Sequence, residues 1–348
     1  MSGGVDSSVA SALLSRDCEV IGLHIRKIDL PGGTDELRRR DEDAAEAAAA
    51  AAKKIGIPLR FVEAGKHFDK LINDFCREYN SGRTPNPCVL CNVNIKWRIL
   101  LEAAESEGAD FVATGHYANI EKRGETFHLV RGKGGAKDQT YFLHRLTQRE
   151  LSKTVFPLAE MTKDETRRIA RELHLPAVER DESQEICFVG AAGYREILES
   201  RTPGEIKAGE VTDTQGNVIG KHEGYQFYTV GQRRGLKIAL GKPAYVVRTD
   251  AESARVVLGG GEDILATRLT AVDVNWVAPP APREPFDALV RIRYNHAGGR
   301  ARVTPRGAEA DVQFEVPVRA VTPGQAAVFY VDDEVIGGGW IAAAQQHI

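Results

Sequence analysis

The sequence predicts an α/β protein in which a parallel-sheet domain is followed by a small β-rich linking domain and a C-terminal β-barrel. A chain of 348 residues is longer than one hydrophobic core usually serves, so two or three domains are expected. Strand and helix patterns alternate in the first part, whereas beyond Pro203-Gly204 short β-branched runs are separated by turns. We therefore place the domains at residues 1–202, 203–267 and 268–348.

The first domain begins as strand, helix and strand. Glu19 to Ile25 and Leu59 to Val62 have the apolar runs of buried strands, and the alanine-rich run Ala44 to Ala52 between them predicts a surface helix. Apolar residues at helical spacing then predict a helix ending near Gly82, and Phe111 to Thr114 predicts another strand. This alternation is typical of parallel strands joined by helices.

The chain opens with a loop that has the composition of an anion site. Glycines let backbone N–H groups approach phosphate oxygens, and a helix beginning near Val5 would aim its unpaired N–H groups at the same anion. No Gly-Lys pair is followed by Ser or Thr, which excludes a Walker P-loop. Asp6 fits either a Mg²⁺ ligand or a helix cap. The predicted phosphate-binding residues are Met1, Ser2, Gly3, Gly4, Val5, Asp6, Ser7 and Ser8.

The loop stands at residue 1, although a phosphate loop of an α/β fold normally follows a buried strand. We expect either that the start codon is assigned too late or that the sheet lacks a central strand. Farther along, Thr162 and Glu165 form the pattern of a capping box and predict a helix start there.

A second informative stretch, Thr84 to Asn92, carries Cys88 and Cys91. We expect the Asn92 side chain to cap the following helix, which would put Cys91 beside the positive helix end. That position lowers the pKa of a thiol and raises its thiolate fraction. Cys187 follows much later in the chain.

These cysteines allow several interpretations. A lone Cys-x-x-Cys is a redox dithiol or half of a zinc site, but no second such pair and no histidine pair at finger spacing follows. Cys88, Cys91 and Cys187 together have the number of ligands for an iron-sulfur cluster with one open iron, which stays open but is not favoured. Cys18 and Cys76 are expected to be buried thiols without a role. Reduced thiols and the lack of an apolar signal segment indicate a cytoplasmic protein.

Arg291 to Arg306 contains five arginines and no acidic residue, with Tyr294 and His296 between them. This pattern favours a surface that contacts RNA phosphates and stacks a base, and the alternative is a solvated strand face. The formal net charge of −3 does not decide between them. A smaller patch of the same kind consists of Arg233, Arg234 and Lys237.

Motifs along nearly the whole chain resemble the tRNA-specific 2-thiouridylases, the MnmA family of PP-loop ATP pyrophosphatases. They occur in family order, and together they are far more specific than any single one. The family uses ATP to transfer sulfur to the 2-position of the wobble uridine of tRNA. The motifs are Ser2 to Ser8, Thr84 to Asn92, Ala113 to Tyr117, Lys137 to Leu143, Ser183 to Phe188, Thr229 to Leu236 and Thr322 to Gln325.

The resemblance implies a role for each matching residue. Cys91 matches the nucleophile and Cys187 the residue that carries a persulfide, whereas Cys88 replaces an aspartate of some members and is a base or a cluster ligand. Ile25 and Gly115 match neighbours of the adenine or ribose. The residues that match contacts to the target base or the tRNA are Asn86, Pro87, Cys88, His116, Lys137, Asp138, Gln139, Arg293, Tyr294 and Gln325.

The expected reaction fits the residue chemistry. Adenylation turns the 2-oxygen of uridine into a good leaving group, and thiolates are suitable nucleophiles for the sulfur step. The expected cofactors are ATP and Mg²⁺, and the expected partners are tRNA and a persulfide or sulfide donor, such as a desulfurase or a relay protein. We expect a monomer without membrane contact. The alternatives are a PP-loop synthetase that adenylates a small metabolite, and an RNA-binding or redox module without catalysis.

Overall fold

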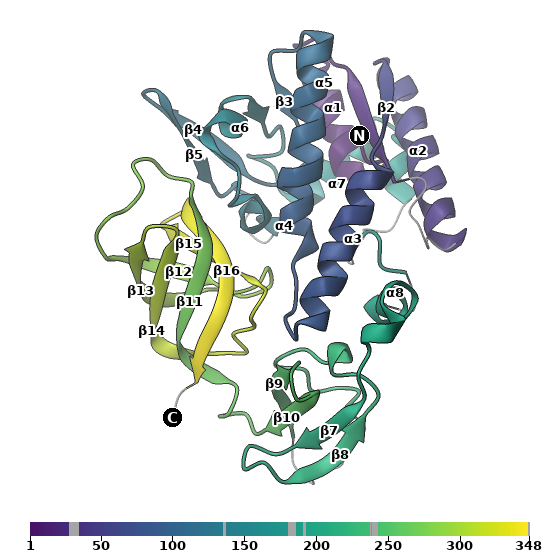
Figure 1. Ribbon diagram of the computed structural model, residues 1–348. Helices are drawn as coiled ribbons and strands as arrows, with labels where there is room; N and C mark the ends of the chain where they lie inside the picture. The colour runs from purple at the N-terminus through teal and green to yellow at the C-terminus, as the bar shows by residue number, and fades with distance from the viewer. Residues whose placement is uncertain are drawn as a thin grey trace.

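The structure is a computed structural model that describes residues 1–27, 35–134, 137–179, 186–190, 193–236, 238 and 243–346. Figure 1 shows its three parts, with the N-terminal helices and strands at the top, a small β domain at the bottom and a barrel at the left. The predicted α/β class with a linking β domain and a C-terminal barrel is confirmed.

The N-terminal part combines helices with short strands. Its helices are α1 (Val5–Leu14), α2 (Asp35–Ile55), α3 (Gly65–Asn80), α4 (Pro87–Cys91), the π-helix η1 (Asn92–Trp97), α5 (Arg98–Glu107), η3 (Thr140–Leu143), α6 (Gln148–Ser152), α7 (Lys163–Glu172), η4 (Pro176–Glu179) and α8 (Tyr194–Arg201). Its strands are β1 (Gly22–Arg26), β2 (Leu59–Glu63), β3 (Val112–Ala113), β4 (Asn119–Arg123), β5 (Thr126–Val130) and β6 (Thr154–Val155).

The strands expected to be parallel are parallel. β1 pairs with β2, with Gly22 opposite Leu59, and β3 pairs with β6. Within the described residues these are two separate two-stranded ladders. The alanine-rich run lies in α2, where Ala45, Ala48, Ala51 and Ala52 are buried. Small side chains on this inward face let α2 approach the N-terminal loop closely.

The small domain is a four-stranded sheet packed against the end of α3. Tyr225 Oη donates to Asn80 O at 2.5 Å, and Thr249 Oγ1 donates to Gly82 O at 2.7 Å. These bonds fix the small domain to the end of the helix that precedes the cysteine stretch. Its elements are η5 (Pro203–Glu205), β7 (Gly209–Thr212), β8 (Val218–His222), η6 (Tyr225–Phe227), β9 (Tyr245–Asp250) and β10 (Arg255–Gly259), with strand order β8-β7-β10-β9.

The C-terminal strands close into a barrel. Their order is β11-β14-β13-β12-β15-β16, and β16 pairs back with β11, so the ring has no open edge. The barrel interior holds a cluster of buried aliphatic and aromatic side chains, among them Val290, Val303 and Phe329. The strands are β11 (Leu265–Trp276), β12 (Phe286–Arg291), β13 (Gly299–Arg306), β14 (Glu309–Arg319), β15 (Ala326–Val331) and β16 (Glu334–Gln346).

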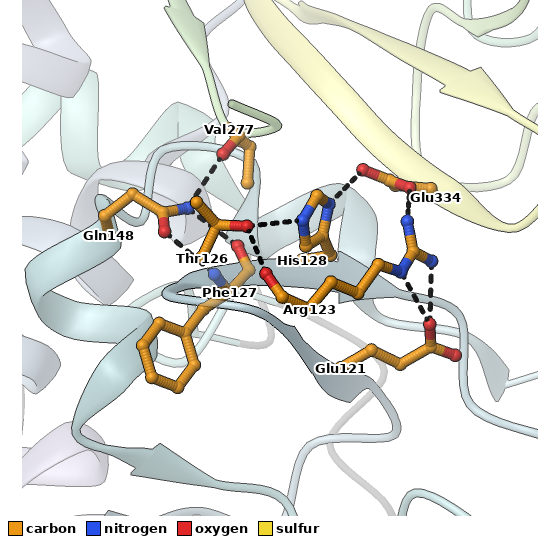
Figure 2. A network of polar contacts seen from close by, with 8 residues as sticks. All are labelled: Glu121, Arg123, Thr126, Phe127, His128, Gln148, Val277 and Glu334. Carbon is orange, nitrogen blue, oxygen red and sulfur yellow. Dashed lines mark hydrogen bonds and ion pairs between the residues drawn. The ribbon is translucent and has the colours of Figure 1, made fainter. Parts of the chain in front are cut away.

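The β4–β5 hairpin of the N-terminal part joins the barrel. Strand β5 pairs with β16, and Glu334 on β16 accepts from Arg123 at 2.6 Å and lies 2.7 Å from His128 Nδ1. Figure 2 shows this network, in which Gln148 also reaches Val277 O at 3.1 Å. A shared hydrophobic cluster continues from the hairpin into the barrel. The first and third predicted domains therefore share one hydrophobic cluster at their junction.

Candidate functional site

The N-terminal loop has the geometry expected of an anion site. Helix α1 begins at Val5 as predicted, and its N-cap residue, Gly4, has no side chain that could cap the first turn. Gly3 adopts φ 78°, a left-handed conformation that favours glycine. The Ser7 and Ser8 hydroxyls donate to Gly4 O at 3.2 and 2.9 Å, which tightens the turn. The first-turn N–H groups are thus without a side-chain cap and suit an anion.

The rest of the loop is tied to the domain. Ser2 Oγ lies 3.1 Å from Ser7 Oγ, and Met1 O lies 2.8 Å from His24 Nδ1 on β1. A Cβ on Gly3 would stand 2.4 Å from Ala44 O of α2, so α2 closes over the loop. The loop is therefore fixed from both sides before any ligand binds.

Asp6 is held by two partners that the sequence patterns did not reveal. Lys163 Nζ lies 2.7 and 2.8 Å from the two carboxylate oxygens, and Tyr117 Oη donates to Oδ1 at 2.9 Å. Lys163 is the first residue of α7, whose predicted capping box is confirmed: Thr162 N donates to Glu165 Oε2 at 2.7 Å. Asp6 is therefore not the cap of α1.

The Asp6 carboxylate, the candidate Mg²⁺ ligand of the sequence, is paired with a lysine in this structure. Both oxygens of Asp6 are engaged by Lys163, and no group of three or more His, Cys, Asp or Glu able to hold a metal occurs in the described part of the chain. In the same described residues, Cys88, Cys91 and Cys187 do not form a group that could hold zinc or an iron-sulfur cluster.

Gly115 and Ile25 lie where the loop meets its neighbours. A Cβ on Gly115 would stand 2.7 Å from the Asp6 carbonyl carbon and from Ser7 N, so only glycine fits against the start of α1. Ile25 is on β1, opposite Val62. The segment that contains Gly115 thus packs closely against the first turn of α1.

The helix carrying the cysteines starts earlier than predicted. It begins at Pro87 and continues through the π-helix η1 into α5, with Asn92 in helical conformation (φ −59°, ψ −52°). The predicted Asn92 cap is wrong, because a proline is well suited to the first turn of a helix and its fixed φ starts the helix there. Asn92 Nδ2 instead donates to Phe142 O at 3.0 Å. Cys91 lies inside the helix, away from its positive end.

The predicted lowering of the Cys91 pKa is also wrong. Cys91 is 7% exposed, and burial raises its pKa to about 12, with the Cys187 and Cys88 charges raising it further and Lys96 opposing. Burial likewise raises the pKa of Cys88 to about 11, again with a contribution from Cys187. Exposed Cys187, although distant in sequence, thus contributes to the raised pKa of both Cys88 and Cys91.

The remaining two cysteines differ from each other. Cys76 is buried in α3 as expected, whereas Cys18 is exposed, contrary to the prediction. Cys18 follows the end of α1 in a turn, where its N–H bonds to Leu14 O at 2.9 Å, and its side chain does not enter the core.

The barrel holds the backbone that leads to the cysteine helix. Gln325 Nε2 donates to Thr84 O and to Pro85 O, both at 3.0 Å, and Thr84 N donates to Pro323 O at 2.9 Å. Asn86 then precedes the helix, and Pro87 is buried at its first position. The predicted base-contact segment and Gln325 are thus brought together.

His116 sits beside the aromatic core. Its Nδ1 lies 2.8 Å from Thr114 Oγ1, and its ring centroid is 5.6 Å from that of Trp97. Burial, with the Lys96 charge, holds the pKa of His116 well below its usual value, so the imidazole is neutral at pH 7. Gln139, the next predicted RNA contact, accepts from Tyr117 N at 3.0 Å.

The arginines of the predicted RNA surface differ in their partners. Three of its arginines have acidic partners at nitrogen to oxygen distances of 2.8 to 3.0 Å, two of them on β12 and β14 and the third, Asp138, in the N-terminal part. Arg293 is exposed and donates to Arg319 O at 3.2 Å, while the Tyr294 ring packs 4.5 Å from Phe142. The three pairs are Arg291 with Asp138, Arg302 with Asp287, and Arg306 with Asp311.

Other predicted residues stand apart from this site. Arg233 and Arg234 are exposed in the small domain, while Lys237 and residues 183–185 lie outside the described residues. A cavity of about 680 Å³ lies between α8 and the small domain, lined by residues such as Tyr194, Lys221 and Tyr228, and none of the predicted site residues lines it.

The fold and the site together define a class. An α/β domain with an anion loop at a helix start, joined to two β domains and a group of interacting thiols, is typical of an ATP-dependent enzyme of the PP-loop kind. Residues 1–191 match the family described as tRNA methyl transferase HUP domain, residues 195–260 its PRC-barrel domain, and residues 266–341 the aminomethyltransferase beta-barrel domain.

The relatives give the particular family. The tRNA-specific 2-thiouridylase MnmA of Geobacter metallireducens is 48% identical over 99% of this chain and 96% of its own length. The protein of that name from Chlorobium phaeovibrioides is 44% identical over 99% and 97%. The chain belongs to the family of tRNA-specific 2-thiouridylases, which confirms the resemblance. In the described residues no helix is long and apolar enough to cross a membrane.

A solved structure is more distantly similar. The U34-tRNA thiolase NcsA from Methanococcus maripaludis with its [4Fe-4S] cluster is 21% identical and covers 59% of this chain and 65% of its own, with a TM-score of 0.34. A likeness this low says nothing about a cluster here.

Proposed function

We propose that this protein uses ATP to form 2-thiouridine at the wobble position of tRNA. One observation carries the proposal: the chain combines an uncapped helix start, suited to phosphate, with Cys91 in a hydrophobic cluster that also contains Ile186 and Phe188, the neighbours of Cys187. A PP-loop synthetase for a small metabolite needs the first feature but not the second.

In the first step, the 2-oxygen of the uridine attacks the α-phosphorus of ATP and pyrophosphate leaves. The N–H groups at Gly3, Gly4 and the first turn of α1 would bind the phosphates. Lys163 lies beside Asp6 at the same helix start, so its ammonium group would add positive charge near them. The uridine then carries AMP on its 2-oxygen, which makes that oxygen a good leaving group.

In the second step, sulfur comes from a persulfide on Cys187. The Cys91 thiolate attacks the Cys187 sulfur, forming a Cys91–Cys187 disulfide and releasing hydrosulfide. Hydrosulfide attacks C2 of the uridine, AMP leaves with the oxygen, and a proton is lost. An external dithiol then reduces the disulfide. This geometry requires Cα atoms about 4.4–6.8 Å apart in the reacting state.

The proposed thiolate must form in an unfavourable place. Burial raises the pKa of Cys91 to about 12, and Lys96 is a nearby cation that lowers it. We expect the bound RNA and persulfide to change this environment before attack. Burial raises the pKa of Cys88 to about 11, so this thiol is protonated at pH 7. We therefore assign it no proton-accepting step.

The partners follow from this chemistry. tRNA is the substrate, and a persulfide-bearing protein or free sulfide supplies the sulfur. Asn86, Pro87, His116, Lys137, Gln139, Arg293, Tyr294 and Gln325 are the proposed RNA-contacting residues. We propose that the protein acts as a cytoplasmic monomer.

The test is mass analysis of the wobble nucleoside after unmodified tRNA is incubated with the enzyme, ATP and a persulfide donor. We expect a gain of sulfur for oxygen, with AMP and pyrophosphate formed in equal amounts. Formation of AMP without RNA, with no change in the tRNA, would contradict the proposal and favour a metabolite synthetase. Wobble thiolation at the normal rate by Cys187→Ser would contradict the persulfide role alone.

A further inference from the structure

A buried ion pair joins the N-terminal domain to the barrel. Arg291 Nη1 donates to Asp138 Oδ2 at 2.8 Å, and the two side chains are 12% and 6% exposed. The other oxygen of Asp138 accepts from the N–H and hydroxyl of Thr140 at 3.1 and 2.7 Å. Arg131 lies 3.8 Å from Oδ2 as well. The Asp138 carboxylate is therefore committed to protein partners.

The same arginine holds a turn of the barrel. After β12 the chain turns through residues 293–296, where His296 N donates to Arg293 O at 3.1 Å. Arg291 Nε donates to His296 O at 3.1 Å, and its Nη2 donates to Tyr294 O. One planar guanidinium thus binds two carbonyls of this turn and a carboxylate of the other domain.

Aromatic rings enclose the guanidinium. Its carbon lies 5.8 Å from the ring centroids of Tyr141 and Tyr294 and 5.9 Å from that of Tyr330. Such an enclosure limits water and adds cation–π attraction, which strengthens the hydrogen bonds of the pair. These contacts hold the Arg291 guanidinium and the Asp138 carboxylate in one fixed arrangement.

The neighbours of the pair are the residues proposed to contact RNA. Lys137 and Gln139 flank Asp138 in sequence, and Gln139 also bonds to Tyr117 N. Arg293 is exposed and belongs to the turn that Arg291 holds. A single ion pair therefore connects two RNA-facing segments of separate domains.

We propose that Asp138 and Arg291 are positioning residues that hold the 137–139 segment and the 293–296 turn as one RNA-binding surface. This corrects the role implied for Asp138, a direct RNA contact, because its carboxylate is buried and fully engaged. The inference rests on the proposed tRNA substrate.

Charge and geometry can be separated at Arg291. A lysine would serve a phosphate contact as a point charge, but it cannot bind a carboxylate and two carbonyls in one plane. A positioning role therefore predicts that Arg291→Lys and Arg291→Gln are equally impaired. A direct phosphate contact predicts that only Arg291→Gln is impaired.

The experiment measures KM for tRNA, KM for ATP and kcat in the full chain. We expect Arg291→Lys, Arg291→Gln and Asp138→Asn each to raise KM for tRNA about tenfold or more, as loss of hydrogen bonds to a charged group does, with KM for ATP unchanged. Arg60→Gln is the matched control, because Arg60 bonds Glu107 at 3.0 Å in an exposed pair remote from the turn in sequence. It should leave all three constants unchanged.

A milder variant guards against misfolding. Thr140→Val removes the hydroxyl that donates to Asp138 at 2.7 Å but leaves both charges paired, and it should raise KM for tRNA several-fold. Unchanged KM for tRNA in Thr140→Val and in Asp138→Asn would overturn the inference, as would wild-type affinity in Arg291→Lys. A wild-type enzyme that neither binds nor thiolates tRNA would instead overturn the proposed function.

Discussion

The nucleotide loop and the cysteine helix differ in how close their resting structure is to the state that the proposed reaction needs. At the loop, Gly3 is already left-handed, α1 starts without a side-chain cap, and Asp6 is held by Lys163. At the cysteine helix, Cys91 is buried and its pKa is raised to about 12, so the thiol is protonated at pH 7. The nucleotide half, which is the N-terminal loop with α1, thus needs little change to bind its ligand. The sulfur half, which is the cysteine helix with Cys187, must change the environment of Cys91 first.

The difference follows from the kind of group each half uses. In the proposed reaction the loop binds phosphate through backbone N–H groups, whose positions are set by glycines and by a helix start and do not depend on pH. The cysteine helix uses an ionisable side chain within an apolar cluster that includes Phe75, Ile95 and Phe188. Burial there disfavours the charged form. We infer that adenylation and sulfur release can be separated by mutation.

The largest expected effect is loss of sulfur transfer in Cys91→Ser. The hydroxyl cannot form the disulfide that releases hydrosulfide, so thiolation should fall to background, while pyrophosphate should still be released when tRNA is added. Mass analysis of the wobble nucleoside and a pyrophosphate assay follow the two steps. Cys18→Ser is the control, because Cys18 is exposed, and it should keep full activity. Loss of tRNA-dependent pyrophosphate release in Cys91→Ser would show that adenylation and sulfur transfer are not separable.

A second prediction damages the loop and spares the cysteines. In Gly115→Ala the new Cβ would stand 2.7 Å from backbone atoms of Asp6 and Ser7, so the start of α1 must shift. Because phosphate binding depends on that placement, the Kd for ATP should rise on the order of ten- to a hundredfold. Calorimetry measures it directly.

The matched control for that change is Gly204→Ala, which places a Cβ where no atom lies within 4 Å. It should leave the Kd for ATP unchanged. Equal ATP binding by Gly115→Ala and the wild type would mean that the loop is not the nucleotide site.

Local signals made the nucleotide half predictable from sequence. The start of α1 at Val5 and the capping box of Thr162 and Glu165 were predicted because glycine, helix-start and capping preferences act within a few residues. Lys163 was missed as a partner of Asp6, since the pair spans 157 residues. The capping box beside it was a usable signal for the helix but not for its contact.

The sequence identified the cysteines of the sulfur half but did not predict their burial or their raised pKa values. The motif located Cys88 and Cys91, yet it could not show that the helix starts at Pro87 or passes into a π-helix at Asn92. Burial of Cys91 depends on partners far along the chain, such as Phe188, and no local pattern reports that. The Arg291–Asp138 pair was missed for the same reason.

A third prediction measures the sulfur half directly by thiol alkylation. Because only the thiolate reacts and burial raises the pKa of Cys91 to about 12 and of Cys88 to about 11, their rates should rise about tenfold per pH unit from pH 7 to pH 10. The exposed Cys18 and Cys187 should be labelled before Cys88 and Cys91 at pH 7. Peptide mass analysis after iodoacetamide treatment gives each rate, and labelling of Cys91 as fast as Cys187 at pH 7 would contradict the resting state.

The smallest expected effect compares the two capping boxes of the chain's described helices. Thr162→Ala and Thr147→Ala each remove a cap, from α7 and α6, and each should cost about 1 kcal/mol of unfolding free energy. Only α7 starts with Lys163, whose ammonium group holds Asp6 at the loop, so only Thr162→Ala should also weaken ATP binding, by a few-fold. Urea unfolding and calorimetry separate the two effects. Equal ATP affinity in both variants at equal loss of stability would mean that the cap of α7 is not needed to hold Lys163 against Asp6, so that the nucleotide loop would depend even less on its surroundings than the cysteine helix does.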